Sequence, residues 1–122
     1  MSKVLLVDDD EGIRLIGQRA LEGIGLEVYL AANAKEGLDL FSKNKVSLVI
    51  TDLKVPGQTG LSLVLDIRKI NPDQPILVIS GGDLEAEWFL RAAREAGGVR
   101  ALSKPFEIEA LIKEVSSLLD GN

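Results

Sequence analysis

Carboxylates, a hydroxyl and an ammonium group follow four short apolar stretches of this 122-residue sequence. They are Asp8, Asp9 and Asp10 after Lys3–Val7, Asp52 after Leu48–Ile50, Ser80 after Ile76–Ile79, and Lys104 shortly after Ala101–Leu102. Carboxylate oxygens are preferred ligands of Mg²⁺, and a hydroxyl and an ammonium can donate hydrogen bonds to phosphate oxygens. Where such groups meet, we expect a site that holds a divalent cation and a phosphoryl group.

The apolar stretches are typical of buried strands, and each polar group stands where its strand ends. A carboxylate is costly to remove from water, so Asp52 should lie at the mouth of a sheet and not inside it. In open α/β sheets, ligands bind outside the carboxyl ends of the strands. Parallel and adjacent strands would therefore bring all of these polar groups to one edge.

Strand and helix patterns alternate along the whole chain. The expected strands are Lys3–Val7, Leu26–Leu30, Leu48–Ile50, Pro75–Ser80 and Val99–Ser103, and the expected helices follow them at Ile13–Ile24, Ala34–Phe41, Leu61–Arg68, Leu84–Ala96 and Ile108–Leu119. This alternation predicts an α/β fold, a doubly wound five-stranded parallel sheet with helices on both faces. Periodicity does not give the strand order. The flavodoxin-like order 2-1-3-4-5 would set the first and third strands side by side, so that Asp8, Asp9 and Asp52 meet.

Polar residues and glycines mark the ends of the first two helices. Asp10 is expected to cap the first helix and Gly25 to end it. Asn33 is expected to cap the second helix, and Glu36, three residues later, fits a capping box. The proline and glycines at positions 56 to 60 are typical of a loop before the third helix.

Residues at helical spacing indicate the helices. Apolar residues recur at this spacing at Ile13, Ile16, Ala20, Leu21 and Ile24, and again at Ile108, Leu111, Ile112, Val115, Leu118 and Leu119. The inner face of the second helix is expected to be Ala34, Leu38 and Phe41, and Leu61, Val64, Leu65 and Arg68 lie along the third helix. The stripe from Ile108 to Leu119 is the most regular, and we expect it to form core. Trp88 and Phe89 are adjacent and cannot both face the core, so one ring is a candidate for a partner contact.

Composition excludes several classes of protein. The length suits one domain, 1–122, with no output domain after it in this chain. The sequence contains no cysteine and no histidine, so disulfides, thiolate metal sites and a histidine general base are excluded. The net charge of −5 disfavours direct nucleic-acid binding. No apolar run reaches the ~18–20 residues of a membrane span and no signal pattern begins the chain, so we expect a cytoplasmic protein.

Four motifs of this sequence resemble one protein family. They are VLLVDDD at the first strand, TDLKVPGQTG at the third, VISGG at the fourth and LSKPF at the fifth. In this order and at this spacing they are similar to the receiver domain of bacterial two-component response regulators, in particular to the chemotaxis-type single-domain regulators. The resemblance covers nearly the whole chain and implies the strand order 2-1-3-4-5.

The resemblance implies a role for each acidic residue of the site. Asp52 matches the aspartate that accepts a phosphoryl group from a histidine kinase or a histidine phosphotransfer protein. Asp8 and Asp9 match the acidic pair that holds Mg²⁺ together with Asp52. Lys54 stands where the family uses a backbone carbonyl as a further metal ligand, so its side chain is not required for that role.

The remaining motif residues match the groups that sense the phosphoryl group. Ser80 matches the hydroxyl that bonds a phosphoryl oxygen, and Lys104 matches the lysine that pairs with it. The Lys104–Pro105 peptide bond is implied to be cis. Ala101 departs from the family, because a tyrosine or phenylalanine that turns inward on phosphorylation is common there. The family usually signals through its fourth helix, fifth strand and fifth helix, which here include Trp88, Phe89 and Ala101, so we expect an unknown downstream protein to bind that face.

Three functions fit these residues. The first is a phosphorylation-activated signalling switch of a two-component phosphorelay, which acts on no separate substrate and catalyses only its own phosphorylation and dephosphorylation. The second is a phosphorylation-independent interaction module with a receiver fold, which only Ala101 favours. The third is an aspartate-nucleophile phosphatase of the haloacid dehalogenase type that uses Asp8 and Asp10. That class needs a longer chain, and it leaves Asp52 unexplained.

Overall fold

The computed structural model describes residues 2–55, 58–81, 91 and 99–120. The helix expected at 84–96 falls outside these residues except for Arg91, and so do Trp88 and Phe89. Within the described residues, none of the helices has the length and apolar character needed to cross a membrane.

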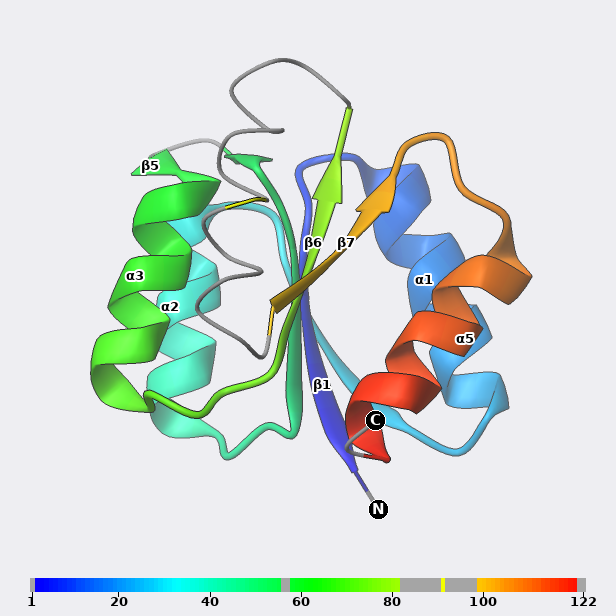
Figure 1. The fold of residues 1–122 in the computed structure, drawn as a ribbon, viewed down its shortest axis with the longest axis horizontal. Coiled ribbons are helices and arrows are strands. Elements are labelled where there is room, and N and C mark those ends of the chain that lie inside the picture. Colours follow the sequence, from blue (N-terminus) through cyan, green and yellow to red (C-terminus); the bar gives the residue numbers. More distant parts are fainter. Residues whose placement is uncertain (1, 56–57, 82–90, 92–98, 121–122) are drawn as a thin grey trace.

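Five parallel strands form the main sheet (Figure 1). They are β1 (Lys3–Val7), β2 (Glu27–Ala31), β3 (Leu48–Asp52), β6 (Ile76–Ser80) and β7 (Val99–Ser103). Their order is β2-β1-β3-β6-β7, and every neighbouring pair is parallel. Counted over the main sheet alone, this is the order 2-1-3-4-5, so the predicted doubly wound fold is confirmed. The order sets β1 directly beside β3.

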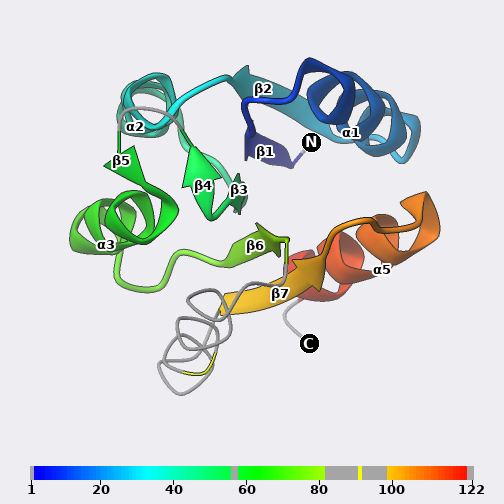
Figure 2. The ribbon, with the colours of Figure 1, turned by 90° about the horizontal axis from the view of Figure 1, so that it is seen from above.

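Helices cover both faces of the sheet. Helices α1 (Glu11–Gly23) and α5 (Ile108–Leu119) lie on one face, and α2 (Ala34–Lys43) and α3 (Gly60–Ile70) lie on the other (Figures 1 and 2). Side chains alternate along each strand, so a parallel sheet buried on both faces supplies two cores. On β1, Leu5 and Val7 pack toward α2 and α3, whereas Val4 and Leu6 pack toward α1 and α5.

Helix α1 begins at the cap that the sequence predicts. The Asp10 carboxylate accepts hydrogen bonds from the N–H groups of Gly12 at 2.8 Å and Ile13 at 3.3 Å. Ile24 is the C-terminal cap, and Gly25 follows it with a φ of +91°. Glycine adopts this left-handed conformation without strain. The predicted end of the helix is therefore right to within one residue.

The capping box predicted for α2 forms only in part. Asn33 accepts a hydrogen bond from the N–H of Glu36 at 2.9 Å, as expected. The Glu36 carboxylate accepts from the N–H of Ala32 at 3.0 Å, whereas a capping box would use the N–H of Asn33. The prediction is wrong for this second bond, because the carboxylate reaches one residue further back into the loop after β2.

The buried face of α1 differs from the predicted stripe. Leu21 of the stripe is buried, but Ile16 and Ile24 are 54% and 43% exposed, and Gly17, which lies outside the stripe, is buried. A Cβ atom at position 17 would lie 2.7 Å from Leu6 Cδ2, so the helix approaches the sheet through a glycine. An apolar stripe cannot reveal this contact, because glycine has no side chain to count.

The buried face of α3 includes Val64 but not the other described residues that mark this helix in the sequence. Leu63 and Ile67 are fully buried and Val64 is 5% exposed, whereas Leu65 is 54% exposed. Arg68 donates from its guanidinium to the carbonyl of Pro72 at 2.9 Å, after the helix ends. Apolar residues occur on several faces of this helix, so more than one stripe fits the same segment.

A short hairpin joins β3 to α3, where the sequence predicts only a loop. Strands β4 (Lys54–Val55) and β5 (Gln58–Thr59) are antiparallel, with Lys54 paired to Thr59 and Val55 paired to Gln58. Strands of two residues are too short to leave an alternating pattern in the sequence.

Replacing Gly37 with alanine is expected to lower the free energy of unfolding. Gly37 lies in α2, and a Cβ atom there would lie 2.9 Å from Cγ2 of Val7. Valine has a stiff rotamer in a strand and cannot move aside freely. Overpacking costs about 1–3 kcal/mol, and most of this range lies above the roughly 1 kcal/mol that alanine gains over glycine in a helix. Urea unfolding measures the difference.

Gly23→Ala is the matched control for this prediction. Gly23 also lies in a helix, and a Cβ atom there would have no neighbour within 4 Å. The control should therefore leave stability unchanged or raise it by up to about 1 kcal/mol. Equal effects at the two positions would contradict the close approach of α2 to β1.

Candidate functional site

The register of the sheet makes Asp8 and Asp52 neighbours. Val7 pairs with Thr51 across β1 and β3, so the next residue of each chain segment lies at the same edge. Asp52 is the last residue of β3, and Asp8 directly follows β1. Because the strands are parallel, both carboxylates leave the sheet at its carboxyl edge, where ligands of such folds bind.

The other two central strands deliver the hydroxyl and the ammonium to the same edge. Asp52 pairs with Ile79, so Ser80 lies one residue further along β6. Ser80 pairs with Ser103 of β7, and Lys104 follows. The N–H of Lys104 continues this ladder by donating to the carbonyl of Ser80 at 2.8 Å. The residues that the sequence singles out on these strands therefore share one edge.

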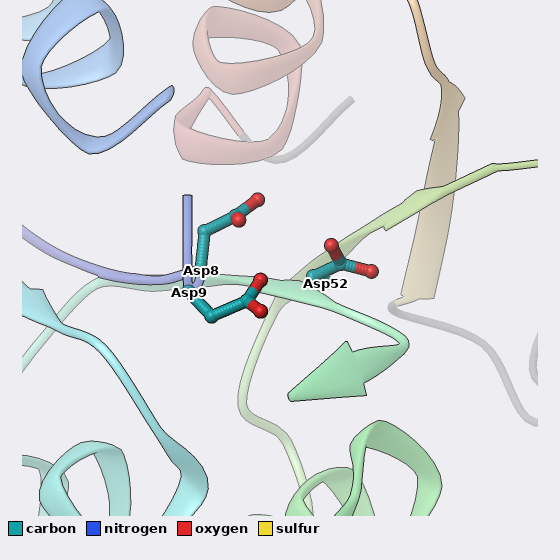
Figure 3. Close-up of side chains that lie close together, drawn as sticks. All are labelled: Asp8, Asp9 and Asp52. Atoms are coloured by element: carbon teal, nitrogen blue, oxygen red, sulfur yellow. The ribbon is translucent and has the colours of Figure 1, made fainter. Parts of the chain in front are cut away.

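Three carboxylates form a cluster at this edge (Figure 3). One oxygen each of Asp8, Asp9 and Asp52 lies within 4.8 Å of the other two. Asp8 is fully buried and Asp52 is 8% exposed, whereas Asp9 is exposed. Carboxylates this close repel one another when ionised, and together they offer the hard oxygen ligands that Mg²⁺ prefers.

Lys104 contacts two of the three carboxylates. Its Nζ donates a hydrogen bond to Oδ2 of Asp52 at 2.6 Å. The same Nζ lies 3.1 Å from Oδ2 of Asp8, as an ion pair. The backbone N–H of Asp10 donates to the other oxygen of Asp8 at 2.9 Å. One ammonium therefore stands between two carboxylates that are largely removed from water.

Burial and charge shift the pKa values of these groups. Burial raises the pKa of Asp8 above its ordinary value of 3.8, although the Asp10 N–H and Lys104 act in the opposite direction. Burial by itself would lower the pKa of Lys104. The hydrogen bond to Asp52 and the contact with Asp8 outweigh it, so the pKa lies above its ordinary value of 10.5. Lys104 is therefore charged at neutral pH.

Replacing Asp8 with asparagine is expected to stabilise the metal-free protein at neutral pH. A raised folded-state pKa means that the carboxyl's contribution to stability is fully present below pH 3.8 and is lost as the pH rises through the folded pKa. Asparagine does not ionise, so the variant does not lose stability as the pH rises. Its side-chain oxygen can still accept a hydrogen bond from the Asp10 N–H. Urea unfolding without Mg²⁺ should give a gain at neutral pH that shrinks toward pH 3.8. A gain that does not change with pH would contradict this account.

The structure also gives the places of the other residues that the sequence singles out. Ser80 is 2% exposed at the end of β6, and the Lys104–Pro105 peptide bond is cis, as the resemblance implies. Lys54 pairs with Thr59 in the hairpin, and its role as a backbone ligand stays a prediction. Ala101 is half-buried on β7.

Two residues of the site were missed by the sequence analysis. The guanidinium of Arg14, on α1, donates to the carbonyl of Asp8 at 2.7 Å. The buried hydroxyl of Thr51 donates to the carbonyl of Asp52 at 3.0 Å. Arg14 carries a signal that could have found it, because a basic residue in the first turn of a helix opposes the helix dipole.

The sequence of this chain matches the response regulator receiver domain over residues 4–116. The chain belongs to this family. Receiver domains are the phosphorylation-driven signalling domains of two-component response regulators, and they work with histidine kinases or phosphotransfer proteins. They bind Mg²⁺ at an acidic pocket, and in this receiver domain the acidic cluster consists of Asp8, Asp9 and Asp52.

Relatives of this receiver domain differ in length. Response regulator MprA of Mycobacterium sp. (strain KMS) is 35% identical over 117 residues, which cover 96% of this chain and 50% of that protein. The chain therefore spans about half the length of the curated relatives it matches at this identity. Sporulation initiation phosphotransferase F of Bacillus subtilis is 28% identical over 118 residues, which cover 96% of this chain and 93% of that protein.

Solved structures of receiver domains share this fold. A CheY-like receiver domain protein from Methanospirillum hungatei JF-1 superposes with a TM-score of 0.90 at 30% identity, covering 99% of this chain and 95% of that one. Chemotaxis response regulator CheY4 of Vibrio cholerae gives a TM-score of 0.86 at 31% identity, with coverage of 97% and 98%. The doubly wound sheet seen here is therefore that of a CheY-like receiver domain.

Proposed function

We propose that this receiver domain is a switch in which Asp52 accepts a phosphoryl group, with Mg²⁺ held by Asp8, Asp9 and Asp52. The donor would be a histidine kinase or a histidine phosphotransfer protein. The observation that carries the proposal is the meeting of three carboxylates and the Lys104 ammonium at the end of β3. A relative whose name is that of a phosphotransferase, from Bacillus subtilis, supports the same chemistry.

The residues of the cluster suit Mg²⁺. All three side chains offer carboxylate oxygens, and Oδ2 of Asp8 is buried, accepts no hydrogen bond and contacts Lys104 at 3.1 Å. A buried charged oxygen is stable only when a cation or donors compensate it. The backbone carbonyl of Lys54 and water molecules would complete a ligand set of the kind that Mg²⁺ prefers.

Asp52 is the nucleophile of the proposed reaction. One of its carboxylate oxygens forms a bond to phosphorus while the phosphorus–nitrogen bond of the donor's phosphohistidine breaks, and the imidazole leaves with that electron pair. Mg²⁺, when bound, would neutralise negative charge on the phosphoryl group. Lys104 supplies a second positive charge, and its hydrogen bond would pass from Asp52 to a phosphoryl oxygen. The domain keeps the group until hydrolysis and acts on no separate substrate.

The proposed signal leaves the site through β6 and β7. The Ser80 hydroxyl and the Lys104 ammonium would both move toward the phosphoryl group, and the two residues are already joined by a backbone hydrogen bond. Arg100 on β7 donates to Ser117 of α5 at 2.7 Å and lies 3.4 Å from Glu114. Movement of β7 would therefore reach α5, and we place the binding of a downstream protein on this face.

A phosphotransfer assay tests the proposal against its alternatives. The chain is mixed with a labelled histidine phosphotransfer domain, with Mg²⁺ or with EDTA. Label that moves to the chain only with Mg²⁺ is the expected result. Binding to the donor without any transfer would support the interaction module instead, which Ala101 favours because it lacks an aromatic ring. Steady release of phosphate from a small ester would support a phosphatase.

A further inference from the structure

Arg14 reaches from α1 back to the end of β1. It lies in the first turn of the helix, where its backbone N–H donates to the carbonyl of Asp10 at 3.1 Å. Its side chain is half-buried, and Nη1 donates to the carbonyl of Asp8 at 2.7 Å. A cation near the amino end of a helix opposes the helix dipole. The contact with Asp8 gives a reason for a cation at this position.

The bond from Arg14 completes the set of contacts that hold Asp8. The Asp8 N–H donates to the carbonyl of Ala31 at 3.1 Å, which continues the ladder between β1 and β2. One side-chain oxygen accepts from the N–H of Asp10 at 2.9 Å. The remaining backbone group of Asp8 is its carbonyl, and Arg14 is the donor to it. A peptide unit is planar, so fixing this carbonyl fixes the orientation of the peptide that leads into Asp9.

Asp9 depends on this backbone for its position. Its side chain is exposed, and no donor within residues 2–55, 58–81, 91 and 99–120 bonds its carboxylate. One of its oxygens nevertheless lies within 4.8 Å of oxygens of Asp8 and Asp52. The place from which the Asp9 side chain leaves the backbone therefore depends on the peptide that Arg14 holds, because the described residues offer its carboxylate no hydrogen-bond donor.

We propose that Arg14 is a positioning residue for the metal ligands Asp8 and Asp9. The inference rests on the proposed Mg²⁺ site and adds a residue to it. Groups that orient metal ligands typically account for a 10–100-fold change in metal affinity when they are removed. Arg14→Met is therefore expected to weaken Mg²⁺ binding by about tenfold. The phosphorylation rate should return to that of the wild type at saturating Mg²⁺, because the nucleophile is unchanged.

The direction of the change in Mg²⁺ affinity distinguishes a positioning role of Arg14 from an effect of its charge. Removing the cation that is bonded to the backbone of Asp8 would by itself favour Mg²⁺ binding, because its repulsion of Mg²⁺ is lost. A weaker affinity in Arg14→Met can therefore not come from the charge change. Arg19→Met is the matched control, because Arg19 is exposed on the same helix and its replacement removes the same charge. Arg14→Lys keeps the charge with a single-point donor and should give an affinity between those of wild type and Arg14→Met.

Titration calorimetry with MgCl₂ on the four proteins tests the inference. The expected result is a Kd about tenfold higher for Arg14→Met and one near the wild-type value for Arg19→Met. In the metal-free proteins, the amide NMR signals of Asp9 and Asp10 should shift in Arg14→Met and stay in place in Arg19→Met. Equal Kd values and unshifted amides in Arg14→Met would overturn the inference.

Two further outcomes are decided by the same data. If circular dichroism shows that Arg14→Met does not fold, the Kd of Arg14→Lys for Mg²⁺ decides. A Kd equal to that of the wild type overturns the inference, and a higher Kd supports it. A wild-type chain that binds no Mg²⁺ contradicts the proposed function itself. The amide signals are recorded without metal, so they test the role of Arg14 in that case too.

Discussion

Asparagine at position 52 is expected to abolish phosphoryl transfer to this receiver domain. The substitution keeps the shape of the side chain and an oxygen that can accept from Lys104, so the strand end should stay folded. An amide oxygen is a very poor nucleophile, and no other carboxylate sits at the end of β3. The transfer of label from a histidine phosphotransfer domain, with Mg²⁺ at a concentration that saturates the mutant, measures the effect. Saturation matters because the substitution also removes one metal ligand.

Asp39→Asn is the control for this experiment. Asp39 is exposed on α2, and the substitution makes the same change of charge away from the site. This variant should accept label at the wild-type rate. If Asp52→Asn were labelled as fully as the wild type, Asp52 would not be the phosphoacceptor, and Asp8 or Asp9 would be the next candidate.

Lys104→Ala is expected to separate phosphorylation from its readout. The ammonium holds the Oδ2 atoms of Asp52 and Asp8 at 2.6 Å and 3.1 Å, so its loss removes the link between β7 and the acids. Mg²⁺ compensates the carboxylates in the loaded protein, so the chain should fold and still take up the phosphoryl group, more slowly. Amide NMR signals of β7 and α5 should then change little on phosphorylation, whereas they shift in the wild type.

Lys113→Ala serves as the matched control for the lysine experiment. Lys113 is exposed on α5, so its replacement removes the same charge without touching the site. Its β7 and α5 signals should respond to phosphorylation as those of the wild type do. A full response in Lys104→Ala would mean that Ser80 alone carries the signal, and that the ammonium has no part in it.

The fold and the meeting of the acidic residues were predictable from sequence because they follow from repeated patterns. Apolar strands that end in Asp8, Asp52 and Ser80 alternate with helical stripes, and this alternation leaves few topologies. The patterns do not give the strand order, which came from the resemblance to receiver domains. With β1 and β3 as parallel neighbours, their register places Asp8 beside Asp52.

The features that the sequence did not predict depend on tertiary contacts. The face of α1 is set by the fit of Gly17 against Leu6, and a glycine adds nothing to an apolar stripe. The hairpin of β4 and β5 is too short to show a period. Arg14 was missed because its bond goes to a backbone carbonyl, and every residue offers one of those.

Intact mass shows whether Asp52 takes up a phosphoryl group with the help of Mg²⁺. Wild type and Asp52→Asn are incubated with acetyl phosphate and Mg²⁺, and both are weighed by mass spectrometry. We expect the wild type to gain the mass of one phosphoryl group with Mg²⁺ and not with EDTA, and the mutant to gain none. The same gain in both proteins, or none in a wild type that binds Mg²⁺, would contradict this role of Asp52.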